Sequence, residues 1–305
     1  MYKQYIKTTS VATRFMARPA SSLGQAPSSI YDQARPDYPS SAIAPLKSVL
    51  HIETDVRKKP LYDVVDVGAG TGKLTRALKR LLPTHTAFAA VEPSLAMRDA
   101  FHSTFPEIPV IDGSYSGTYL PSESVGNIMI GYAIHSCAER NTLEEFHRVL
   151  VPNGRLGIVW NSVDLSETPF MHEVDKILKS FNILKPVVPS ESRRLKDCFH
   201  ESPNLFTELE SLQVPIVHTT TVQDVVEYLL TLSVVESLPH RKQTDIRLSI
   251  ARLIESSAKV RYDGGQKLID LPCLVEMFWC TKLPVDETAA ASHVHVSTPP
   301  RVMKH

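Results

Sequence analysis

The sequence lacks long hydrophobic runs, paired cysteines and an excess of charge of either sign. No apolar run approaches the roughly 20 residues that a membrane-spanning helix needs. The four cysteines form no C-x-x-C pair and have no histidines beside them at zinc spacing. Lys+Arg and Asp+Glu both number 33, so the net charge gives no overall attraction to nucleic acid or to an anionic membrane. We therefore expect a protein with reduced thiols, no metal site, no nucleic-acid partner and no membrane association.

Acidic residues are also absent from the first 28 residues, where basic residues, serine, threonine and alanine are frequent. This composition suits a mitochondrial transit peptide. Because the amphipathic pattern is weak, we favour a disordered basic extension (1–28) of a cytoplasmic protein and keep a mitochondrial location as the alternative. The tail at 286–305 is also expected to be disordered. Residues 29–285 then form one domain, and the hydrophobic share of the chain, 43%, is ample for its core.

A glycine-rich stretch stands at the centre of this domain. Residues 61–67 form a short, valine-rich apolar run, which predicts a strand buried on both faces. Gly68, Gly70 and Gly72 follow at alternate positions, and apolar residues at helical spacing come next. A strand, a glycine loop and a helix together present backbone N–H groups and a helix N-terminus to a ligand. The stretch therefore predicts a cofactor site that includes the three glycines.

Two acidic residues narrow the choice of cofactor. Asp66 lies two residues before the first glycine, where its carboxylate is expected to face an ammonium group. Glu92 ends a second predicted strand, at the position where a carboxylate binds two ribose hydroxyls. Lys73 stands where the dinucleotide fingerprint needs a glycine, which argues against NAD. The D-x-G-x-G-x-G pattern with its downstream glutamate resembles class I methyltransferases that use S-adenosylmethionine (SAM).

A second motif, which precedes the glycines, makes the resemblance more specific. The string Tyr-x-x-Ala-Arg-Pro-x-Tyr-Pro at residues 31–39 is similar to one in a family of small-molecule methyltransferases related to the trans-aconitate methyltransferases. In that family the segment folds over the SAM site. The resemblance implies that Tyr31 and Arg35 close on the methionine end of SAM, with Arg35 paired to its carboxylate. The other interpretation is that Arg35 caps a helix or pairs with a surface acid.

The segment after the third predicted strand departs from the family pattern. The family has a Gly-x-Ala-Glu tetrad that contacts adenine, whereas this chain has Gly-Ser-Tyr-Ser at residues 113–116. We expect Asp112 to accept a hydrogen bond from the adenine amino group in place of the missing acid. Tyr115 is a candidate for stacking on the base. The alternative is a plain surface loop.

The fourth predicted strand leads to His135, at the edge of the sheet where ligands bind in open α/β folds. If the methyl acceptor is a hydroxyl or an amine, His135 is the expected general base, with Tyr31 as the alternate. A structural role for His135 is the other interpretation. The family has an aromatic residue after this histidine, whereas the chain has Ser136, which leaves the substrate preference open.

The remaining pattern completes a Rossmann-like α/β fold, a doubly wound and mostly parallel sheet of seven strands with helices on both faces. Residues 42–59 predict a helix before the first strand, and residues 165–211 predict an inserted helical lid. The sixth and seventh strands are expected at 212–218 and 274–281, with the last one antiparallel. Thr221 predicts the capping-box start of a helix.

The sequence therefore predicts a SAM-dependent methyltransferase that transfers a methyl group to a small molecule by in-line displacement. A monomer or a homodimer is expected. A sulfonium methyl group is already activated, so positioning of the acceptor matters more than a catalytic triad or a metal. One alternative is a catalytically inactive SAM-binding or scaffold protein of the same fold, and another is an NAD-dependent oxidoreductase.

Overall fold

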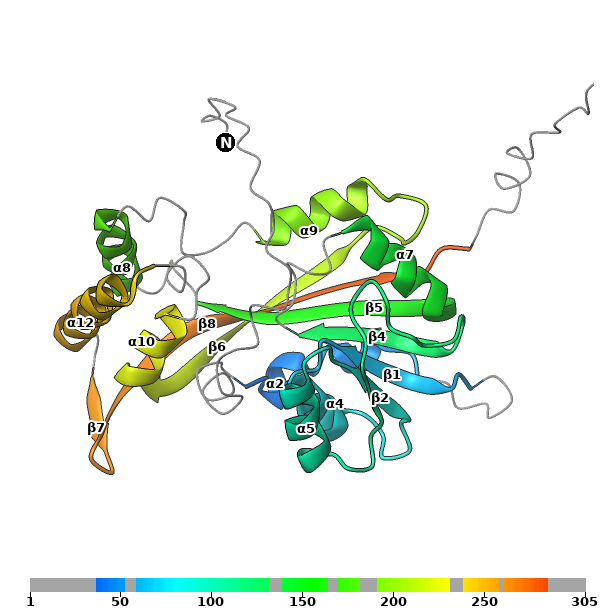
Figure 1. Cartoon of the computed structure of the whole chain (residues 1–305), viewed down its shortest axis with the longest axis horizontal. Helices are drawn as coiled ribbons and strands as arrows, with labels where there is room; N and C mark the ends of the chain where they lie inside the picture. Colours follow the sequence, from blue (N-terminus) through cyan, green and yellow to red (C-terminus); the bar gives the residue numbers. More distant parts are fainter. Residues whose placement is uncertain are drawn as a thin grey trace, which may run out of the picture.

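The protein consists of a central twisted sheet with helices on both faces and a further group of helices at one end of the sheet (Figure 1). The computed structural model describes residues 37–52, 59–131, 139–163, 169–181, 191–230, 238–257 and 260–284. The predicted N-terminal extension and the predicted tail lie outside these ranges. The domain boundaries expected from the sequence therefore stay predictions.

The sheet has the topology expected of a Rossmann-like fold. Its strands are β1 (Tyr62–Val67), β2 (Phe88–Val91), β3 (Val110–Ile111), β4 (Val125–Gly131), β5 (Leu150–Val163), β6 (Glu210–Thr221), β7 (Arg261–Asp263) and β8 (Gln266–Thr281). The order is β3-β2-β1-β4-β5-β8-β6, with β7 paired to β8 outside this path. β1 to β5 pair in parallel, whereas β8 is antiparallel to both β5 and β6. The predicted mostly parallel sheet, with an antiparallel last strand, is confirmed.

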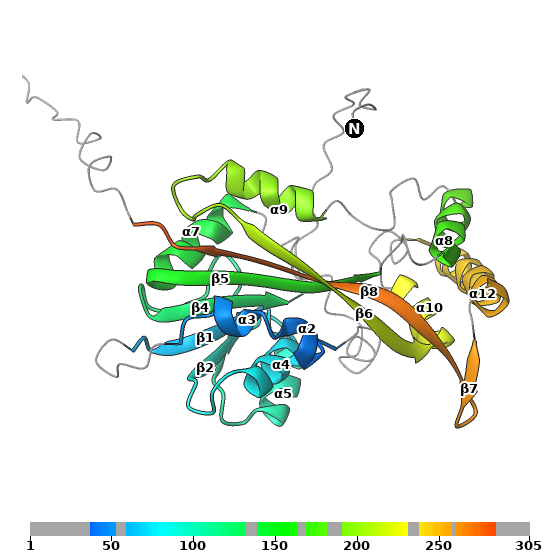
Figure 2. The ribbon, with the colours of Figure 1, turned by 180° about the vertical axis from the view of Figure 1, so that it is seen from behind.

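Helices cover both faces of this sheet, as predicted (Figure 2). The described helices, including those at the end of the sheet, are α2 (Ser40–Ile43), α3 (Leu46–Val49), α4 (Lys73–Leu81), α5 (Leu95–Thr104), α7 (Arg140–Val149), α8 (Pro169–Ser180), α9 (Glu191–His200), α10 (Val222–Leu230) and α12 (His240–Ser257). α7 and α9 share a hydrophobic cluster with one face of the sheet, and α2, α3 and α4 share a cluster with the other.

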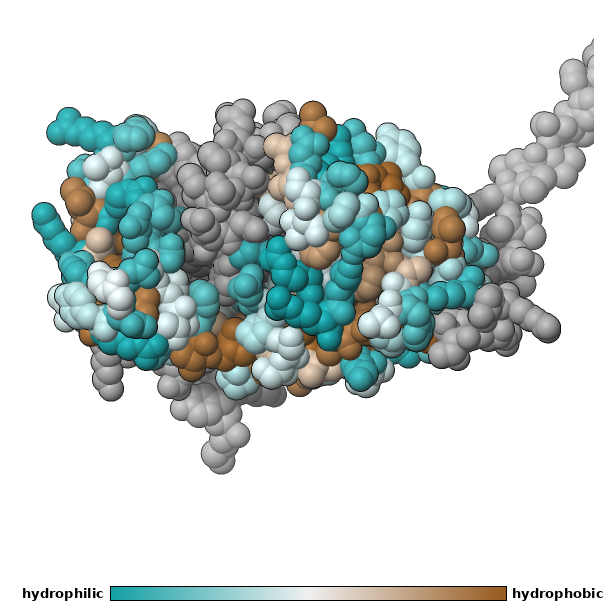
Figure 3. Space-filling view, turned by 90° about the horizontal axis from the view of Figure 1, so that it is seen from below, coloured by the Kyte–Doolittle hydropathy of each residue, from teal (hydrophilic) through white to brown (hydrophobic). Residues whose placement is uncertain are grey.

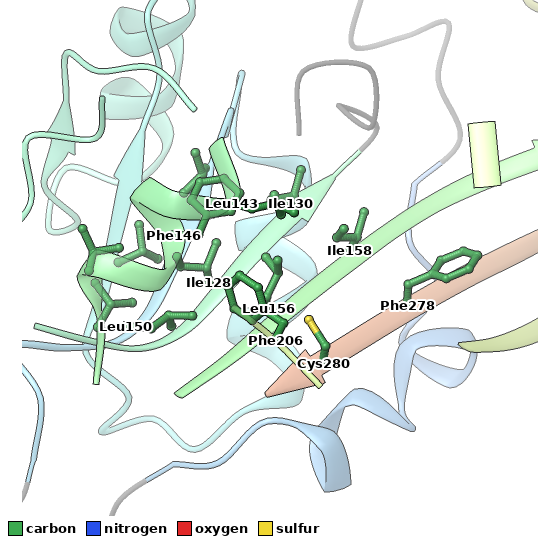
Figure 4. Packing of buried hydrophobic residues seen from close by; sticks show 14 of the residues in the cluster. Ile128, Ile130, Leu143, Phe146, Leu150, Leu156, Ile158, Phe206, Phe278 and Cys280 are labelled. Atoms are coloured by element: carbon green, nitrogen blue, oxygen red, sulfur yellow. The ribbon is translucent and has the colours of Figure 1, made fainter. Parts of the chain in front are cut away.

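The alternation of side chains along the strands divides the core into these two clusters. Ile128 and Leu156 point toward α7, where they join Phe146 (Figure 4). Met129 is the next residue along β4 and points to the opposite face, where it joins Leu78 of α4. All five side chains are fully buried. Burial of both faces explains why β1 and β4 read as nearly continuous apolar runs in the sequence.

β6 and β8 continue beyond the carboxyl end of β5. Val163 at the end of β5 pairs with Cys273, whereas β8 starts at Gln266 and stays paired with β6 along this extra length. Helices α8, α10 and α12 pack on the extension through a third hydrophobic cluster, which includes Val226 and Ile250. We call these three helices and the strand extension the helical module. It stands at the end of the sheet to which the carboxyl ends of β4 and β5 point (Figure 1).

The predicted lid at 165–211 contains two described helices with different surroundings. α8 belongs to the helical module. α9 packs on the central sheet, where Leu195 and Phe199 join the cluster on the α7 face. A lid function for this segment stays a prediction, and the structure adds α10 and α12 to the elements at this end of the sheet.

Two element boundaries differ from the prediction for local reasons. In the described part of the helix expected at 42–59, which ends at residue 52, the chain forms two short helices, because Pro45 lacks the N–H group that a continuous helix needs. β8 begins eight residues before the expected 274, because Gly264 and Gly265 adopt positive φ and form a tight turn between β7 and β8. The helix start predicted at Thr221 is confirmed, since the Thr221 hydroxyl accepts from the Asp224 N–H at 3.0 Å and donates to the Asp224 carboxylate at 2.7 Å.

The surface mixes polar and apolar side chains. In Figure 3 hydrophobic residues form small separate patches among polar ones. Among the described residues, the exposed large hydrophobic ones are Leu61, Leu95, Tyr119, Leu212, Val217, Leu248 and Tyr262. Within the ranges that the structure describes, no helix has the length and apolarity to cross a membrane.

Candidate functional site

The glycine loop joins the carboxyl end of β1 to the start of α4. Gly68, Gly70 and Gly72 all have positive φ, at 73°, 56° and 89°, a conformation that residues with a Cβ adopt at a cost. The Gly68 N–H donates to the carbonyl oxygen of Val91 at 2.7 Å, which holds the loop to the end of β2. Gly72 is the N-cap of α4. The predicted strand, glycine loop and helix are therefore confirmed.

The three glycines have different surroundings. A Cβ on Gly68 would lie 1.8 Å from the hydroxyl oxygen of Tyr115, and a Cβ on Gly72 would lie 2.6 Å from a ring carbon of Phe105. A Cβ on Gly70 would meet no atom of the described residues within 4 Å. The packing of α4 against Phe101 of α5 and against Phe105 therefore requires a glycine at position 72. Among the described residues, the loop has open space beside Gly70, which leaves room for a ligand.

Glu92 follows β2 and contacts the loop at this open position. Its Oε2 accepts a hydrogen bond from the Gly70 N–H at 2.9 Å, and its Oε1 accepts one from the Ser94 N–H at 2.9 Å. Each carboxylate oxygen can accept a second hydrogen bond. The structure therefore brings the predicted residues Gly70 and Glu92 together. Glu92 is 7% exposed, and its contact with ribose hydroxyls stays a prediction.

Asp66 lies inside the protein, between β1 and the first turn of α4. Its side chain is 1% exposed, and its Oδ2 accepts a hydrogen bond from the Thr75 hydroxyl at 2.6 Å. Its Oδ1 has no hydrogen-bond partner among the described residues. Burial raises the pKa of Asp66 to about 7, against the lowering effect of the hydrogen bonds from Thr75. The carboxylate ties β1 to the first turn of α4, and a direct contact with an ammonium group stays a prediction.

We expect Asp66 to make the stability of the protein depend on pH. Its pKa is about 7 in the folded state and about 3.9 in an unfolded chain, so between these values the folded protein keeps a proton that the unfolded chain has released. The free energy of unfolding should therefore fall as pH rises from about 4 through about 7, by up to about 1.4 kcal/mol per pH unit. Urea unfolding of the wild type and of Asp66→Asn between pH 5 and 8 measures this effect, and the variant should lose this part of the slope.

Thr75→Val is the matched companion for this experiment. It removes a hydrogen bond that lowers the pKa of Asp66, so the loss of stability should start at the same pH as in the wild type and extend to higher pH. Equal pH profiles for the wild type and Asp66→Asn would contradict the role assigned to this carboxyl group.

Asp112 has a partner that the sequence did not predict. Its two carboxylate oxygens accept hydrogen bonds from the Arg98 guanidinium at 3.0 and 2.9 Å. The same guanidinium donates to the carbonyl oxygens of Glu92 and Pro93. Arg98 of α5 thus fixes the end of β2 relative to the residue after β3. The predicted contact of Asp112 with adenine stays a prediction, and any such contact has to share the carboxylate with Arg98.

The described end of the N-terminal motif lies against β5. The Asn161 side-chain amide donates to the carbonyl oxygen of Asp37 at 3.1 Å, and the Tyr38 hydroxyl donates to that of Val159 at 3.4 Å. The Asp37 carboxylate also pairs with the ammonium group of Lys73, the first residue of α4, at 3.4 Å. The chain therefore passes the glycine loop just after Tyr31 and Arg35, which themselves lie outside the described residues, as does His135.

His218 of β6 is a polar residue near the loop that sequence reasoning missed. It lies on the same face of β6 as Ile216, which packs against both the α4 cluster and the helical module. Burial lowers the pKa of His218 and the charge of Lys73 lowers it further, whereas Asp37 and Asp224 raise it. The charges that act on His218 come from separate segments of the chain, so no local pattern in the sequence marks their combined effect.

Metal ligands do not gather in the part of the chain that the structure describes: no group of three or more His, Cys, Asp or Glu side chains is placed there to hold an ion. The three described cysteines, Cys198, Cys273 and Cys280, are buried. Burial raises the pKa of the Cys280 thiol well above its ordinary value, which suppresses the reactive thiolate.

Comparison with known proteins agrees with the geometry of the loop. Residues 64–154 match a family model described as a methyltransferase domain. The chain is 27% identical over 240 residues to an uncharacterised methyltransferase-like protein of Schizosaccharomyces pombe, and the aligned region covers 78% of this chain and 88% of the relative. It is 34% identical over 134 residues to an uncharacterised methyltransferase of Mycobacterium bovis, which covers 44% of this chain and 50% of that relative.

A solved structure shows the same fold. A candidate type II methyltransferase of Anaeromyxobacter dehalogenans superposes with a TM-score of 0.54 at 20% identity, over 82% of this chain and 99% of the other. This likeness shows the Rossmann-like fold, and residues 64–154, which include the glycine loop, resemble a methyltransferase domain. The narrower resemblance to the trans-aconitate methyltransferases rests on the motif at 31–39 and stays a prediction.

Proposed function

We propose that the protein uses SAM to methylate a small molecule by in-line displacement. The observation that carries this proposal is the contact of Glu92 with the glycine loop at Gly70, beside the open space that borders the loop. This arrangement offers a carboxylate for two ribose hydroxyls and backbone N–H groups for the rest of a nucleoside ligand. Lys73 stands directly after the loop and fills the position that a dinucleotide fingerprint reserves for glycine.

Residues of this chain would hold the cofactor as follows. Glu92 would bind the ribose, and the loop from Gly68 to Gly72 would lie along the ligand. Tyr31 and Arg35 would close on the methionine end, since the described end of their segment already passes the loop at Asp37. When bound, SAM supplies a methyl group that the sulfonium charge has activated.

The remaining task of the protein is to place the acceptor and to exclude water. In-line transfer needs the acceptor atom about 3–3.5 Å from the methyl carbon. The helical module stands at the end of the sheet where such an acceptor would approach and would limit access by water. For a hydroxyl or amine acceptor, we propose that His135 takes the proton, with Tyr31 as the alternate.

Calorimetry tests the cofactor proposal directly. Titration of the protein with SAM, with S-adenosylhomocysteine and with NADH should give binding for the first two and none for NADH at the same concentrations. Tighter binding of NADH, or no binding of either sulfur ligand, would refute the proposal.

Labelling tests the class of acceptor. SAM that carries an isotopic methyl label is incubated with the protein and a metabolite extract. The products are then separated by molecular mass, and the label in each fraction is measured. We expect the label in small molecules and not in protein or nucleic acid. If SAM binds but no label transfers to any fraction, the chain is a SAM-binding protein without catalytic activity.

A further inference from the structure

A row of polar side chains crosses three strands near the carboxyl end of β5. Trp160 of β5, Glu276 of β8 and Gln213 of β6 stand side by side in the register of the sheet. Oε1 of Glu276 accepts hydrogen bonds from the Trp160 indole N–H at 3.2 Å and from the Ser162 hydroxyl at 2.8 Å. Its Oε2 accepts one from the Gln213 side-chain amide at 3.1 Å. One carboxylate therefore joins all three strands through donors that carry no charge.

The negative charge of this carboxylate is not matched by a cation of the chain. Among the described residues Glu276 forms no ion pair, whereas Asp270 on the same face of β8 is paired with Arg261 at 2.9 Å. A carboxylate accepts about four hydrogen bonds, so the three donors leave one position on Oε2. Because Glu276 is half-buried and a buried charge is costly without a partner, a cationic group at this position would be stabilising.

The row lies just beyond the end of β4, at the edge of the sheet where the glycine loop stands. β4 ends at Gly131, which pairs with Val159, so Trp160 and Ser162 extend past it. β1 and β8 are three strands apart in the sheet, which corresponds to about 14 Å at a spacing of about 4.8 Å per strand. A nucleoside ligand on the loop and a small acceptor beside it together span a distance of this size.

The surroundings of the row fix the carboxylate and leave one side of it accessible. Trp160 is 5% exposed, Glu276 is half-buried and Gln213 is exposed, so solvent reaches the row from the side of β6. The buried Trp160 ring stacks on Phe278 with 4.8 Å between the ring centroids. The ammonium group of Lys196 in α9 lies 5.9 Å from the centroid of the Phe278 ring, so one cation of the chain already lies on this face of the sheet.

We propose that Glu276 binds an ammonium group of the methyl acceptor, so that the protein methylates small molecules that carry an amino group away from the reacting atom. This proposal rests on the proposed function and names the class of its acceptor. Trp160, Ser162 and Gln213 are positioning residues, because their hydrogen bonds orient the carboxylate. The anchored ammonium group takes no part in the transfer: the acceptor atom bonds to the methyl carbon as the bond from sulfur to that carbon breaks. A carboxylate that only ties β5, β8 and β6 together is the competing interpretation.

Labelled SAM and a metabolite extract test the class of acceptor. A strong cation exchanger at low pH retains compounds with an amino group, and we expect the labelled products other than SAM in this retained fraction. In Glu276→Gln the rate of labelling of the same products should fall by about 10- to 100-fold, because a hydrogen bond between two charged groups is lost. The affinity of the variant for S-adenosylhomocysteine should stay within about threefold of the wild type.

Asp270→Asn is the matched control. Asp270 lies on the same strand and the same face as Glu276 and is already paired with Arg261, so its replacement should change neither the labelling nor the affinity for S-adenosylhomocysteine. The melting temperatures of both variants show that they are folded.

Three probes of equal chain length test the preference for charge on the wild type itself. Butylammonium, butanol and butyrate are added separately to the protein saturated with S-adenosylhomocysteine, and saturation-transfer NMR measures their binding. Butylammonium should bind best. It should also shift the indole N–H signal of Trp160, one of the two tryptophans of the chain, whereas butyrate should not. This signal locates the ammonium group beside Glu276 without any substitution.

The possible failures are distinguishable. If the wild type does not bind S-adenosylhomocysteine, the proposed function fails and this inference fails with it. If it binds that ligand but the label enters only compounds without an amino group, or butanol or butyrate binds as well as butylammonium, the acceptor class is wrong. If the Trp160 signal does not shift, or if Glu276→Gln labels the same products at the rate of the wild type, Glu276 does not hold the acceptor. If Glu276→Gln loses affinity for S-adenosylhomocysteine by the same factor as labelling, the carboxylate acts through the sheet and its role is structural.

Discussion

Replacement of Glu92 by glutamine should weaken SAM binding by about 100-fold. The Glu92 carboxylate accepts hydrogen bonds from the N–H groups of Gly70 and Ser94. Glu92 is also the residue that we propose to hold the ribose. Hydrogen bonds to a charged group contribute about 1.5–3 kcal/mol each, and a loss of about 3 kcal/mol corresponds to about two powers of ten in affinity. Glutamine has the same shape but loses the charge and turns an NH₂ group toward one of the backbone donors. Calorimetry with SAM measures the change.

Glu107→Gln is the matched control for this variant. Glu107 is an exposed glutamate that pairs with Lys79 away from the loop, so its replacement should leave SAM affinity unchanged. The melting temperature of Glu92→Gln shows that the variant is folded when it is titrated. Binding by Glu92→Gln within about threefold of the wild type would remove Glu92 from the ribose contact.

Gly70→Ala should mainly weaken SAM binding, whereas Gly72→Ala should mainly lower the stability of the protein, although both glycines have positive φ. Gly70→Ala places its methyl group in open space, so the protein should lose only about 1–2 kcal/mol of stability to backbone strain while SAM affinity falls at least about tenfold. Gly72→Ala forces its methyl group onto Phe105 and Phe101. Overpacking of a core costs about 1–3 kcal/mol and adds to the strain, so the melting temperature should fall by about 5–15 °C.

A compensating change tests the second half of this prediction. Phe105→Leu shortens the side chain that the new methyl group would meet, so it should restore part of the stability of Gly72→Ala and none of the SAM affinity of Gly70→Ala. Thermal unfolding measures the stability, and calorimetry measures the SAM affinity, of the two alanine variants and of each of them combined with Phe105→Leu. Similar losses of stability and of affinity in the two alanine variants would show that Gly70 does not border the ligand.

The features that sequence predicted correctly are those with local patterns. Valine-rich runs mark β1 and β4 because both faces of these strands are buried. The glycine loop and Glu92 were predicted from spacing, and the structure joins them by a hydrogen bond. The break at Pro45 and the turn at Gly264 and Gly265 also have local signals in the sequence. The prediction did not use these signals, although they indicate where α2 ends and where β8 begins.

The features that sequence did not predict depend on how elements dock. Asp66 turns inward because α4 brings Thr75 next to it, and no spacing rule states where a hydroxyl of the next helix will lie. Asp112 is paired because α5 presents Arg98 to the end of β3. The contact of Tyr115 with Gly68 likewise joins two loops that are far apart in the chain. Tertiary packing decides each of these.

The long pair of strands β6 and β8 takes part in two separate regions of the protein. The part of this pair beside β5 completes the sheet that positions the glycine loop, whereas its overhang carries a hydrophobic cluster of its own. Substitutions among α8, α10 and α12 can therefore change the overhang while the sheet around the glycine loop keeps its packing. Under the proposed function, the preference for an acceptor would then change at one end of two strands without changes at the glycine loop.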